Sequence, residues 1–375
     1  MIKITKFLIC IIMIVSVHFI PVYAQEEKKE NITENKTGFF QTIKYMFYPP
    51  PDDDLRTNSR VLSMSRILRK DDVSLRIKYR ICESLGREGE DAIPPLLLVL
   101  KSEESDAASR HRAAQSLAQI GIPAIKYLIQ IIEDDRYEGY VKNEACFALG
   151  EMGEPAVEEL LKIVSDPKKS VAFRSMAIKA LGISKSQKAL SYITSALKDK
   201  DPVIRANSAS ALGKINNNLA IPTLIVTLGD PDKAVRSSTI DALASFKKEA
   251  VDEVLKAVND ENSLRRAGAI EVLGMLKTKE AFKPVLERLN DKDSEVKASA
   301  AKALGEIGNK NALKPLIVAL DDGNPNVRYY AAKSLGEVGD PGTIPVLEKH
   351  LNDSSLMVYN GIKSSIRKIK RRASN

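Results

Sequence analysis

The chain has 375 residues, no Trp and an aromatic content of only 5%, which argues against a single thick globular core. Its net charge of +8 is unevenly distributed, because six bases and no acid lie between residues 354 and 375: Lys363, Arg367, Lys368, Lys370, Arg371 and Arg372. A nucleic-acid-binding protein is expected to spread its positive charge along the binding surface, since phosphate neutralisation supplies most of the affinity. The composition therefore predicts that nucleic acid is not a partner.

The first 24 residues have the pattern of an export signal. Lys3 and Lys6 precede an apolar run from Phe7 to about Ile20, and small residues stand one and three places before Gln25. The run is shorter than the roughly 20 apolar residues of a membrane-spanning helix. We therefore predict a signal peptide over residues 1–24 that is cleaved after Ala24, with the mature chain in the periplasm or cell envelope of a bacterium. An uncleaved anchor is the alternative, and it would leave the rest of the chain on the same side of the membrane.

Residues 25–56 are predicted to form a flexible linker, because residues 25–38 are polar and charged without any periodicity. Within them, the segment 39–48 is rich in Phe and Tyr. Two roles fit such a segment: it caps the structure that follows, or it docks onto a partner or a membrane surface.

From residue 57 onward the sequence repeats itself. The same apolar position recurs every 30 to 32 residues, and we call these positions the anchors: Leu85, Leu117, Leu149, Leu181, Leu212, Leu243, Leu273, Leu304, Leu335 and Ile366. Gly follows seven of the first nine anchors, and Ala118 and Ala244 follow the other two. A fixed period of this length indicates stacked units that bury their apolar faces only against one another. The recurring Gly suggests that helices of neighbouring units approach closely there.

Each unit divides into two predicted helices separated by a polar turn. In the ninth unit the first helix covers 311–320, with Pro315 in its opening turns, and the second covers 326–337. A base stands seven residues before each of the first nine anchors, and in most units an acid stands in the turn before that base. We expect the acid to cap the second helix or to pair with a base of its own or a neighbouring unit, which would fix the stacking register.

The chain resembles HEAT repeats in having two helices per unit, an acidic turn and motifs such as the ten residues from Val327 to Gly336. Its short period is similar to that of the bacterial subtype named after phycobilisome lyases. The resemblance covers residues 57–370. It implies an all-α, right-handed α-solenoid of about ten two-helix repeats over residues 57–372, which ends in a basic C-terminal tail, 363–375.

The resemblance also offers chemistry to compare. Deoxyhypusine hydroxylase, built on similar repeats, needs several His-Glu pairs to hold two irons, whereas here Arg112 follows His111 and Leu351 follows His350. No nucleophile motif or phosphate-binding loop is present either. The sequence therefore predicts no catalytic residue, no metal site and no cofactor.

The predicted function is that of a non-enzymatic scaffold or adaptor that binds a protein partner along its concave face and is itself monomeric. In HEAT-like stacks the second helices line that face, so the residues six and five places before each anchor should point outward. The central units carry small side chains there, and larger ones stand near the ends: Tyr79, Arg80, His111, Arg112, Tyr329 and Tyr330. Aromatic residues and Arg are enriched at binding hot spots, so these six are the candidate partner-binding residues.

Two alternatives remain for the function and for the tail. The chain could be a lyase-like or chaperone-like HEAT protein that assists the modification of a client protein. The basic tail could make a weak contact with a membrane surface, because cations near anionic headgroups are attracted to them.

Overall fold

The computed structural model describes residues 59–68, 70 and 73–374 of the chain. These belong to a compact unit that runs from Ser59 onward. The predicted signal peptide, 1–24, and the predicted linker, 25–56, with its aromatic segment 39–48, lie outside the described residues.

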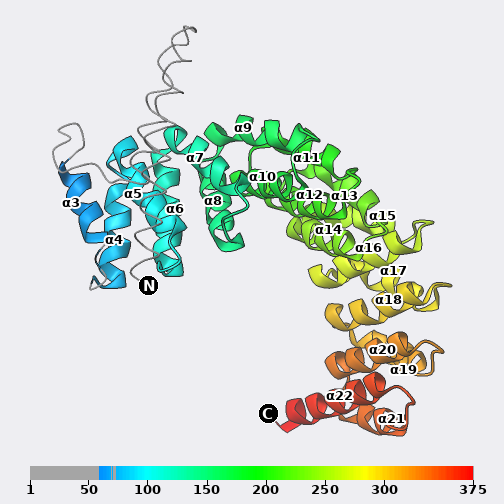
Figure 1. Ribbon diagram of the computed structural model, residues 1–375. Helices are drawn as coiled ribbons and strands as arrows, with labels where there is room; N and C mark the ends of the chain where they lie inside the picture. Colours follow the sequence, from blue (N-terminus) through cyan, green and yellow to red (C-terminus); the bar gives the residue numbers. More distant parts are fainter. Residues whose placement is uncertain (1–58, 69, 71–72, 375) are drawn as a thin grey trace, which may run out of the picture. The chain divides into compact units, whose positions relative to one another are not determined.

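The described residues form twenty α-helices and no strand, and the helices follow one another as ten pairs in a row (Figure 1). The first helices of the pairs are α3 Ser59–Leu68, α5 Ile93–Lys101, α7 Ile122–Glu133, α9 Glu154–Ser165, α11 Leu190–Ala196, α13 Ile221–Thr227, α15 Val251–Ala257, α17 Phe282–Glu287, α19 Leu313–Ala319 and α21 Ile344–Lys349. The second helices are α4 Leu75–Leu85, α6 Ala107–Ile120, α8 Gly139–Glu151, α10 Val171–Ser184, α12 Pro202–Ile215, α14 Lys233–Ser245, α16 Ser263–Leu276, α18 Ser294–Ile307, α20 Pro325–Val338 and α22 Leu356–Ser374. The predicted all-α solenoid of ten two-helix repeats is confirmed. None of these helices is both long and apolar enough to span a bilayer.

The helix ends follow from the turn residues. An Asp, Asn or Ser side chain accepts a backbone N–H at the start of seven second helices, as Asp293 does from Val296 at the start of α18. Pro stands in the first turn of several first helices, where its missing N–H costs nothing. Residues 363–374, predicted as a tail, continue the last helix, α22.

The core is one continuous apolar layer between the two rows of helices. The nine Leu anchors are all fully buried, and Ile366 is nearly so. Contacts run mainly from each second helix to the next and to the first helix of its own pair. The burial of each unit therefore depends on its neighbours, as expected for a repeat array.

The Gly after the anchor is explained by the spacing of the second helices. A Cβ added to Gly213 would lie 2.8 Å from the Cα of Ala242, and one added to Gly305 would lie 2.8 Å from the Cα of Ser334. The obstacle is backbone in both cases, so it cannot be removed by rotating a side chain. At these interfaces Gly allows adjacent second helices to pack almost backbone to backbone.

Gly305→Ala is accordingly expected to destabilise the protein by roughly 1–3 kcal/mol, although Ala is the better helix former, because it forces α18 and α20 apart. Urea unfolding followed by circular dichroism measures the change. Gly139→Ala in α8 is the matched control, since its added Cβ meets no atom within 4 Å. Equal stability of Gly305→Ala and the wild-type chain would show that the interface tolerates expansion.

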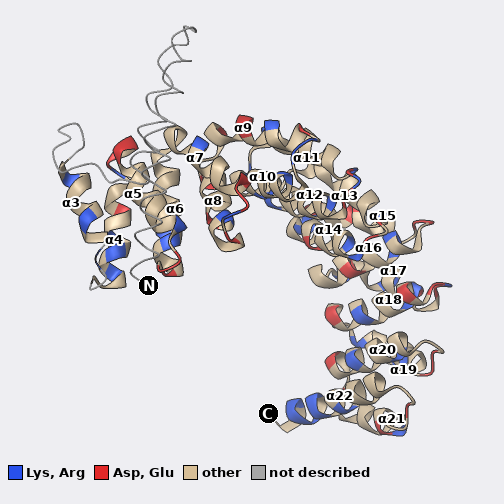
Figure 2. Cartoon of the chain, viewed as in Figure 1, with Lys and Arg blue, Asp and Glu red and all other residues tan. Residues whose placement is uncertain are grey.

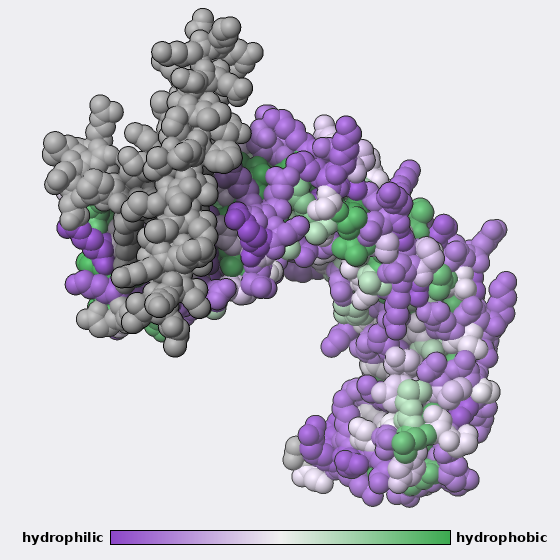
Figure 3. All heavy atoms as spheres, in the orientation of Figure 1, coloured by the Kyte–Doolittle hydropathy of each residue, from purple (hydrophilic) through white to green (hydrophobic). Residues whose placement is uncertain are grey.

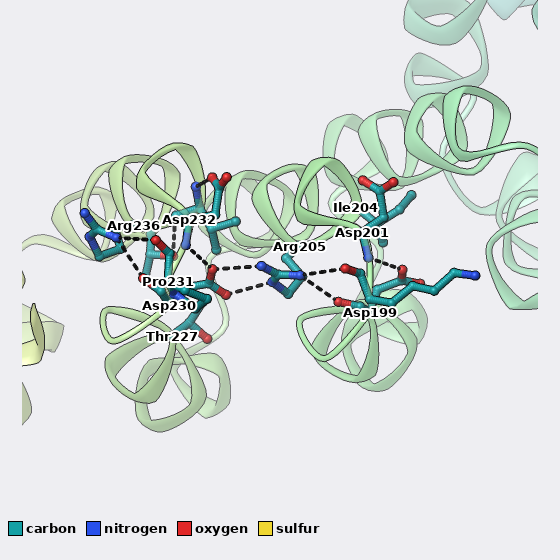
Figure 4. Close-up of polar contacts among 12 residues, drawn as sticks. Asp199, Asp201, Ile204, Arg205, Thr227, Asp230, Pro231, Asp232 and Arg236 are labelled. Atoms are coloured by element: carbon teal, nitrogen blue, oxygen red, sulfur yellow. Dashed lines mark hydrogen bonds and ion pairs between the residues drawn. The ribbon is translucent and has the colours of Figure 1, made fainter. Parts of the chain in front are cut away.

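The predicted pairing of turn acids with bases joins neighbouring units. Arg205 of α12 donates to both carboxylate oxygens of Asp230 at 2.7 and 2.9 Å and also to the carbonyl oxygen of Asp199 in its own turn (Figure 4). The same contact recurs with a separation of 25 residues in four further pairs: Arg174–Asp199, Arg266–Asp291, Lys297–Asp322 and Arg328–Asp353. We call this series the ion-pair ladder. Arg205, Arg266 and Arg328 also donate to carbonyl oxygens of their own turns, so each of these three ties its turn to that of the next unit.

The ladder has a gap between α14 and α16. Arg236 of α14 donates to carbonyl oxygens of its own turn, and Asp260, in the next turn, pairs with Arg265 instead. The anchor of α14 is also one of the two that Ala follows, at Ala244. Helices α14 and α16 contact each other much less than α12 and α14 do.

Candidate partner-binding surface

The second helices together form one side of the row, which we call the second-helix face. Side chains on this face pair between neighbouring units by a simple rule: the residue six places before one anchor meets the residue five places before the next. Asn207 donates to the hydroxyl of Ser175 at 2.7 Å in this way. Side chains at these positions therefore contact the adjacent helix and do not all point outward as predicted.

The rule explains the small residues of the central units. Ser175, Ala267, Gly268, Ala298 and Ser299 are buried between neighbouring helices. The prediction that the small central side chains point outward is wrong for these five. At Ser175 the neighbour is Asn207 of the next second helix, whereas a Cβ added to Gly268 would lie 2.8 Å from the side chain of Leu228, just after α13.

Near the start of the array the same positions carry large side chains. The guanidinium carbon of Arg112 lies 4.4 Å from the ring centroid of Tyr79, and Arg112 donates to the Tyr79 hydroxyl. His111 Nδ1 is 3.0 Å from Glu144 Oε2, and its ring lies 4.6 Å from that of Phe147. These five residues, from α4, α6 and α8, form what we call the α4–α8 cluster. All five side chains are half-buried, so the cluster is reachable from solvent.

Arg80 does not join the cluster. It is exposed on α4 and makes no hydrogen bond or ion pair with any residue that the structure describes.

Tyr329 and Tyr330 lie at the other end of the array, on α20. Their rings meet edge to face at 5.1 Å, and Tyr329 packs over Gly361 of α22, where an added Cβ would come within 2.9 Å of the ring. Both side chains are half-buried against the core. The two predicted groups of site residues thus sit on the same face but near opposite ends of the described array.

Charged residues on α16 and α18 were not among the predicted site residues. Lys302 donates to Glu271 at 2.9 Å, and the hydroxyl of Ser299 lies 3.3 Å from the same carboxylate. Glu306, one turn further along α18, has a buried Oε2 without a hydrogen-bond partner. Glu271 and Lys302 stand two places before their anchors and Glu306 two places after, so a search of those positions at the repeat period would have found them.

The carboxyl of Glu306 is poorly accommodated as an anion. Burial raises the pKa of Glu306. Attraction by Lys302 lowers this pKa only in part, and repulsion by Glu271 raises it further. Because the folded state holds this proton more tightly than the unfolded chain, folding is favoured at low pH. The contribution of Glu306 to stability falls as pH rises from its ordinary pKa near 4.5 through its raised value.

Glu306→Gln should therefore stabilise the protein at neutral pH, because it removes the buried negative charge and keeps the shape of the side chain. Thermal unfolding at several pH values measures the effect. The gain should shrink as pH falls through the raised pKa of Glu306 toward 4.5, because wild-type Glu306 becomes protonated over that range. A gain that is the same at every pH would point to packing rather than ionisation.

Two shallow hollows open on the described surface. One, of about 350 Å³, is lined by Arg112, Gln115, Ala118, Gln119 and Glu151 between α6 and α8. The other, of about 370 Å³, lies around Gly339 and Arg372 where α20 meets α22. The first adjoins the α4–α8 cluster and occurs where Ala118 replaces the Gly that closes most other interfaces. Among the described residues, no three His, Cys, Asp or Glu side chains are placed to share a metal ion.

A one-dimensional stack of helix pairs, held together by neighbour contacts, defines an α-solenoid repeat protein. The family model of HEAT repeats matches residues 125–213, 157–230, 221–299 and 282–359. The chain therefore belongs to the HEAT-repeat family, as its resemblance implied. No curated protein matches it in sequence.

Several solved structures are similar to this chain at low sequence identity. Kap121p is 13% identical with a TM-score of 0.53, covering 84% of this chain and 44% of its own. Human deoxyhypusine hydroxylase is 19% identical with a TM-score of 0.29, over 69% of this chain and 98% of its own. The CpcE–CpcF complex of phycocyanin lyase from Nostoc sp. PCC7120 is 17% identical with a TM-score of 0.32, and the match covers 65% of this chain and 94% of the other. The similarity to Kap121p shows the fold alone.

Proposed function

We propose that this HEAT-repeat protein is an exported, non-enzymatic scaffold that holds a partner polypeptide against its second-helix face. The observation that supports this most directly is the α4–α8 cluster. It joins Tyr79, His111, Arg112 and Phe147 with one carboxylate, Glu144. These residues lie on three consecutive second helices, and the cluster borders an open hollow. Aromatic residues and Arg that are half-buried before binding lose little side-chain freedom on association, which favours them as anchors.

Photo-crosslinking tests where the partner sits. A photoreactive residue placed at Arg80, exposed beside the cluster, should capture a polypeptide in cells that make the protein. The same residue at Val226, which is 57% exposed on α13, is the control from the first helices. The proposal predicts a crosslinked species from position 80 that is absent from position 226. Equal crosslinking at both positions, or at neither, would contradict it.

Substitution within the cluster gives the second test. His111→Ala removes the contacts with Glu144 and Phe147, so recovery of the same crosslinked species should fall at least tenfold. Tyr192→Ala, at an exposed aromatic position on α11, should leave recovery unchanged. Thermal unfolding of both variants separates a lost contact from a lost fold.

The export part of the proposal rests on the sequence of residues 1–24. Expression of the whole chain in a bacterium should yield a periplasmic product whose N-terminal residue is Gln25. A cytoplasmic product that begins at Met1 would refute both cleavage and export.

A further inference from the structure

The outward face of α22 carries a row of cations without acidic partners. Val358, Gly361, Ile362, Ser365, Ile366 and Ile369 bury the inner face of this helix. Lys363, Arg367 and Arg371 follow one another at intervals of four residues, and all three are exposed. At 3.6 residues per turn they lie along the side away from the core. We call these three residues the cationic stripe.

The other bases of α22 have structural partners. Lys368 pairs with Glu337 at 2.5 Å, Lys370 lies 3.8 Å from Glu348, and Arg372 donates to the carbonyl oxygens of Glu337 and Gly339 at the end of α20. These three hold α22 against its neighbours. They therefore need no further ligand.

The stripe residues differ from them. Arg367 and Arg371 make no hydrogen bond or ion pair with any described residue, and Lys363 contacts only the phenol of Tyr359, at 3.1 Å. Figure 2 shows α22 as a helix with blue segments and no red ones. Like charges four residues apart repel each other on a helix, so the stripe weakens the helix that carries it. The helix dipole favours cations only in the last turn, which does not account for Lys363 and Arg367.

We propose that the cationic stripe is a docking surface for an anionic phospholipid membrane. Lys363 to Arg371 spans about 12 Å along the helix, and neither hollow described above includes a stripe residue. A row of exposed cations along the outer side of one helix fits a plane of headgroup phosphates better than an extended peptide, which needs walls to fix its path. Leu356 lies on the same side of α22, is 71% exposed and can enter the acyl boundary while the cations contact phosphates.

This inference is independent of the proposed scaffold function, since it uses neither the α4–α8 cluster nor the second-helix face. It also changes how the basic segment can be tested. Deleting residues 363–375 would remove Ile366 and Ile369 from the core and Arg372 from the end of α20, so a loss of binding would not distinguish docking from unfolding.

Vesicle co-sedimentation with point variants tests the proposal. The chain starting at Gln25 is used, because it keeps the whole compact unit from Ser59 onward and lacks the apolar run that would itself enter vesicles. Vesicles of phosphatidylcholine alone are compared with vesicles of phosphatidylcholine mixed with phosphatidylglycerol. The triple variant Lys363→Gln, Arg367→Gln, Arg371→Gln should lose roughly 100-fold in affinity for the mixed vesicles.

The matched control is Lys248→Gln, Lys279→Gln, Lys314→Gln, which removes the same charge from exposed lysines on other units. It should lose no more than about threefold, since distant charges are screened by salt. Unchanged binding by the stripe variant, an equal loss in both variants, or no preference of the wild-type chain for phosphatidylglycerol would overturn the proposal. Binding of the wild-type chain to polyglutamate but not to the mixed vesicles would also overturn it, in favour of an acidic polypeptide.

Discussion

Asp291→Ala is expected to lower the free energy of unfolding by about 3–5 kcal/mol, because it leaves a buried guanidinium without its counter-ion. Arg266 and Asp291 form the most buried pair of the ion-pair ladder, with side chains 5% and 4% exposed. Arg266 donates to both carboxylate oxygens, at 3.0 and 2.9 Å. Burial disfavours the charged carboxylate, but the hydrogen bonds from Arg266 and the Asp293 amide outweigh it, so the pKa of Asp291 is lowered.

Equilibrium unfolding in urea measures this loss. The control is Asp322→Ala, which breaks the corresponding pair with Lys297 where that side chain is 26% exposed, and it should cost only about 1 kcal/mol. The pKa of Asp291 is lower in the folded protein than in the unfolded chain, so the ionised carboxylate contributes its full stabilisation above the ordinary pKa of Asp. This stabilisation is lost as pH falls through the lowered pKa. The difference in stability between the wild-type chain and Asp291→Ala should therefore shrink in acid. Equal effects of the two substitutions at pH 7 would show that burial does not set the strength of the ladder.

Leu243→Ala, at the anchor of α14, should cost roughly 2–5 kcal/mol, because the side chain is fully buried and its removal leaves a cavity that stacked helices fill only partly. In a repeat array the loss should be felt most by the units in contact. Hydrogen exchange should therefore quicken chiefly in α12, α14 and α16. The exposed position Val226, on α13, supplies the control, since Val226→Ala should change stability by less than about 0.5 kcal/mol. Unaltered unfolding of Leu243→Ala would mean that the anchors are not the core.

The fold could be predicted from the sequence because each unit repeats the same signals. The ninth unit shows this: its first helix was expected at 311–320 and begins as a short 3₁₀ turn followed by Leu313–Ala319, while its second, expected at 326–337, is Pro325–Val338. The Gly that follows seven of the anchors correctly indicated close helix approach. For the turn acids, capping of the second helix and pairing with a base of the same or a neighbouring unit were all left open. In the structure Asp199, Asp230, Asp291 and Asp322 pair with the base of the preceding unit, whereas Asp135 pairs with Lys142 of its own unit.

The candidate surface could be predicted only in part, for a geometric reason. Helical periodicity tells which residues share a face, but the direction of a side chain on that face depends on how closely the next helix packs. Tyr329 and Gly361 illustrate the limit, since the ring lies over a Gly of the adjacent unit that is 32 residues away in sequence. The same pairing rule joins Tyr79 to Arg112, and Tyr329 lies beside Tyr330, whereas Arg80 stays exposed and His111 contacts Glu144 and Phe147, which were not predicted.

The gap in the ladder has a mechanical consequence. Between α14 and α16 the array lacks both the close glycine contact and the cross-unit ion pair that stiffen most interfaces around it. Thermal bending concentrates at the most compliant joint of a series. We therefore expect the units on either side of this joint to tilt at lower energetic cost than those across the neighbouring interfaces. Under the proposed function, such a tilt would let the protein fit partners of different width without unfolding a helix.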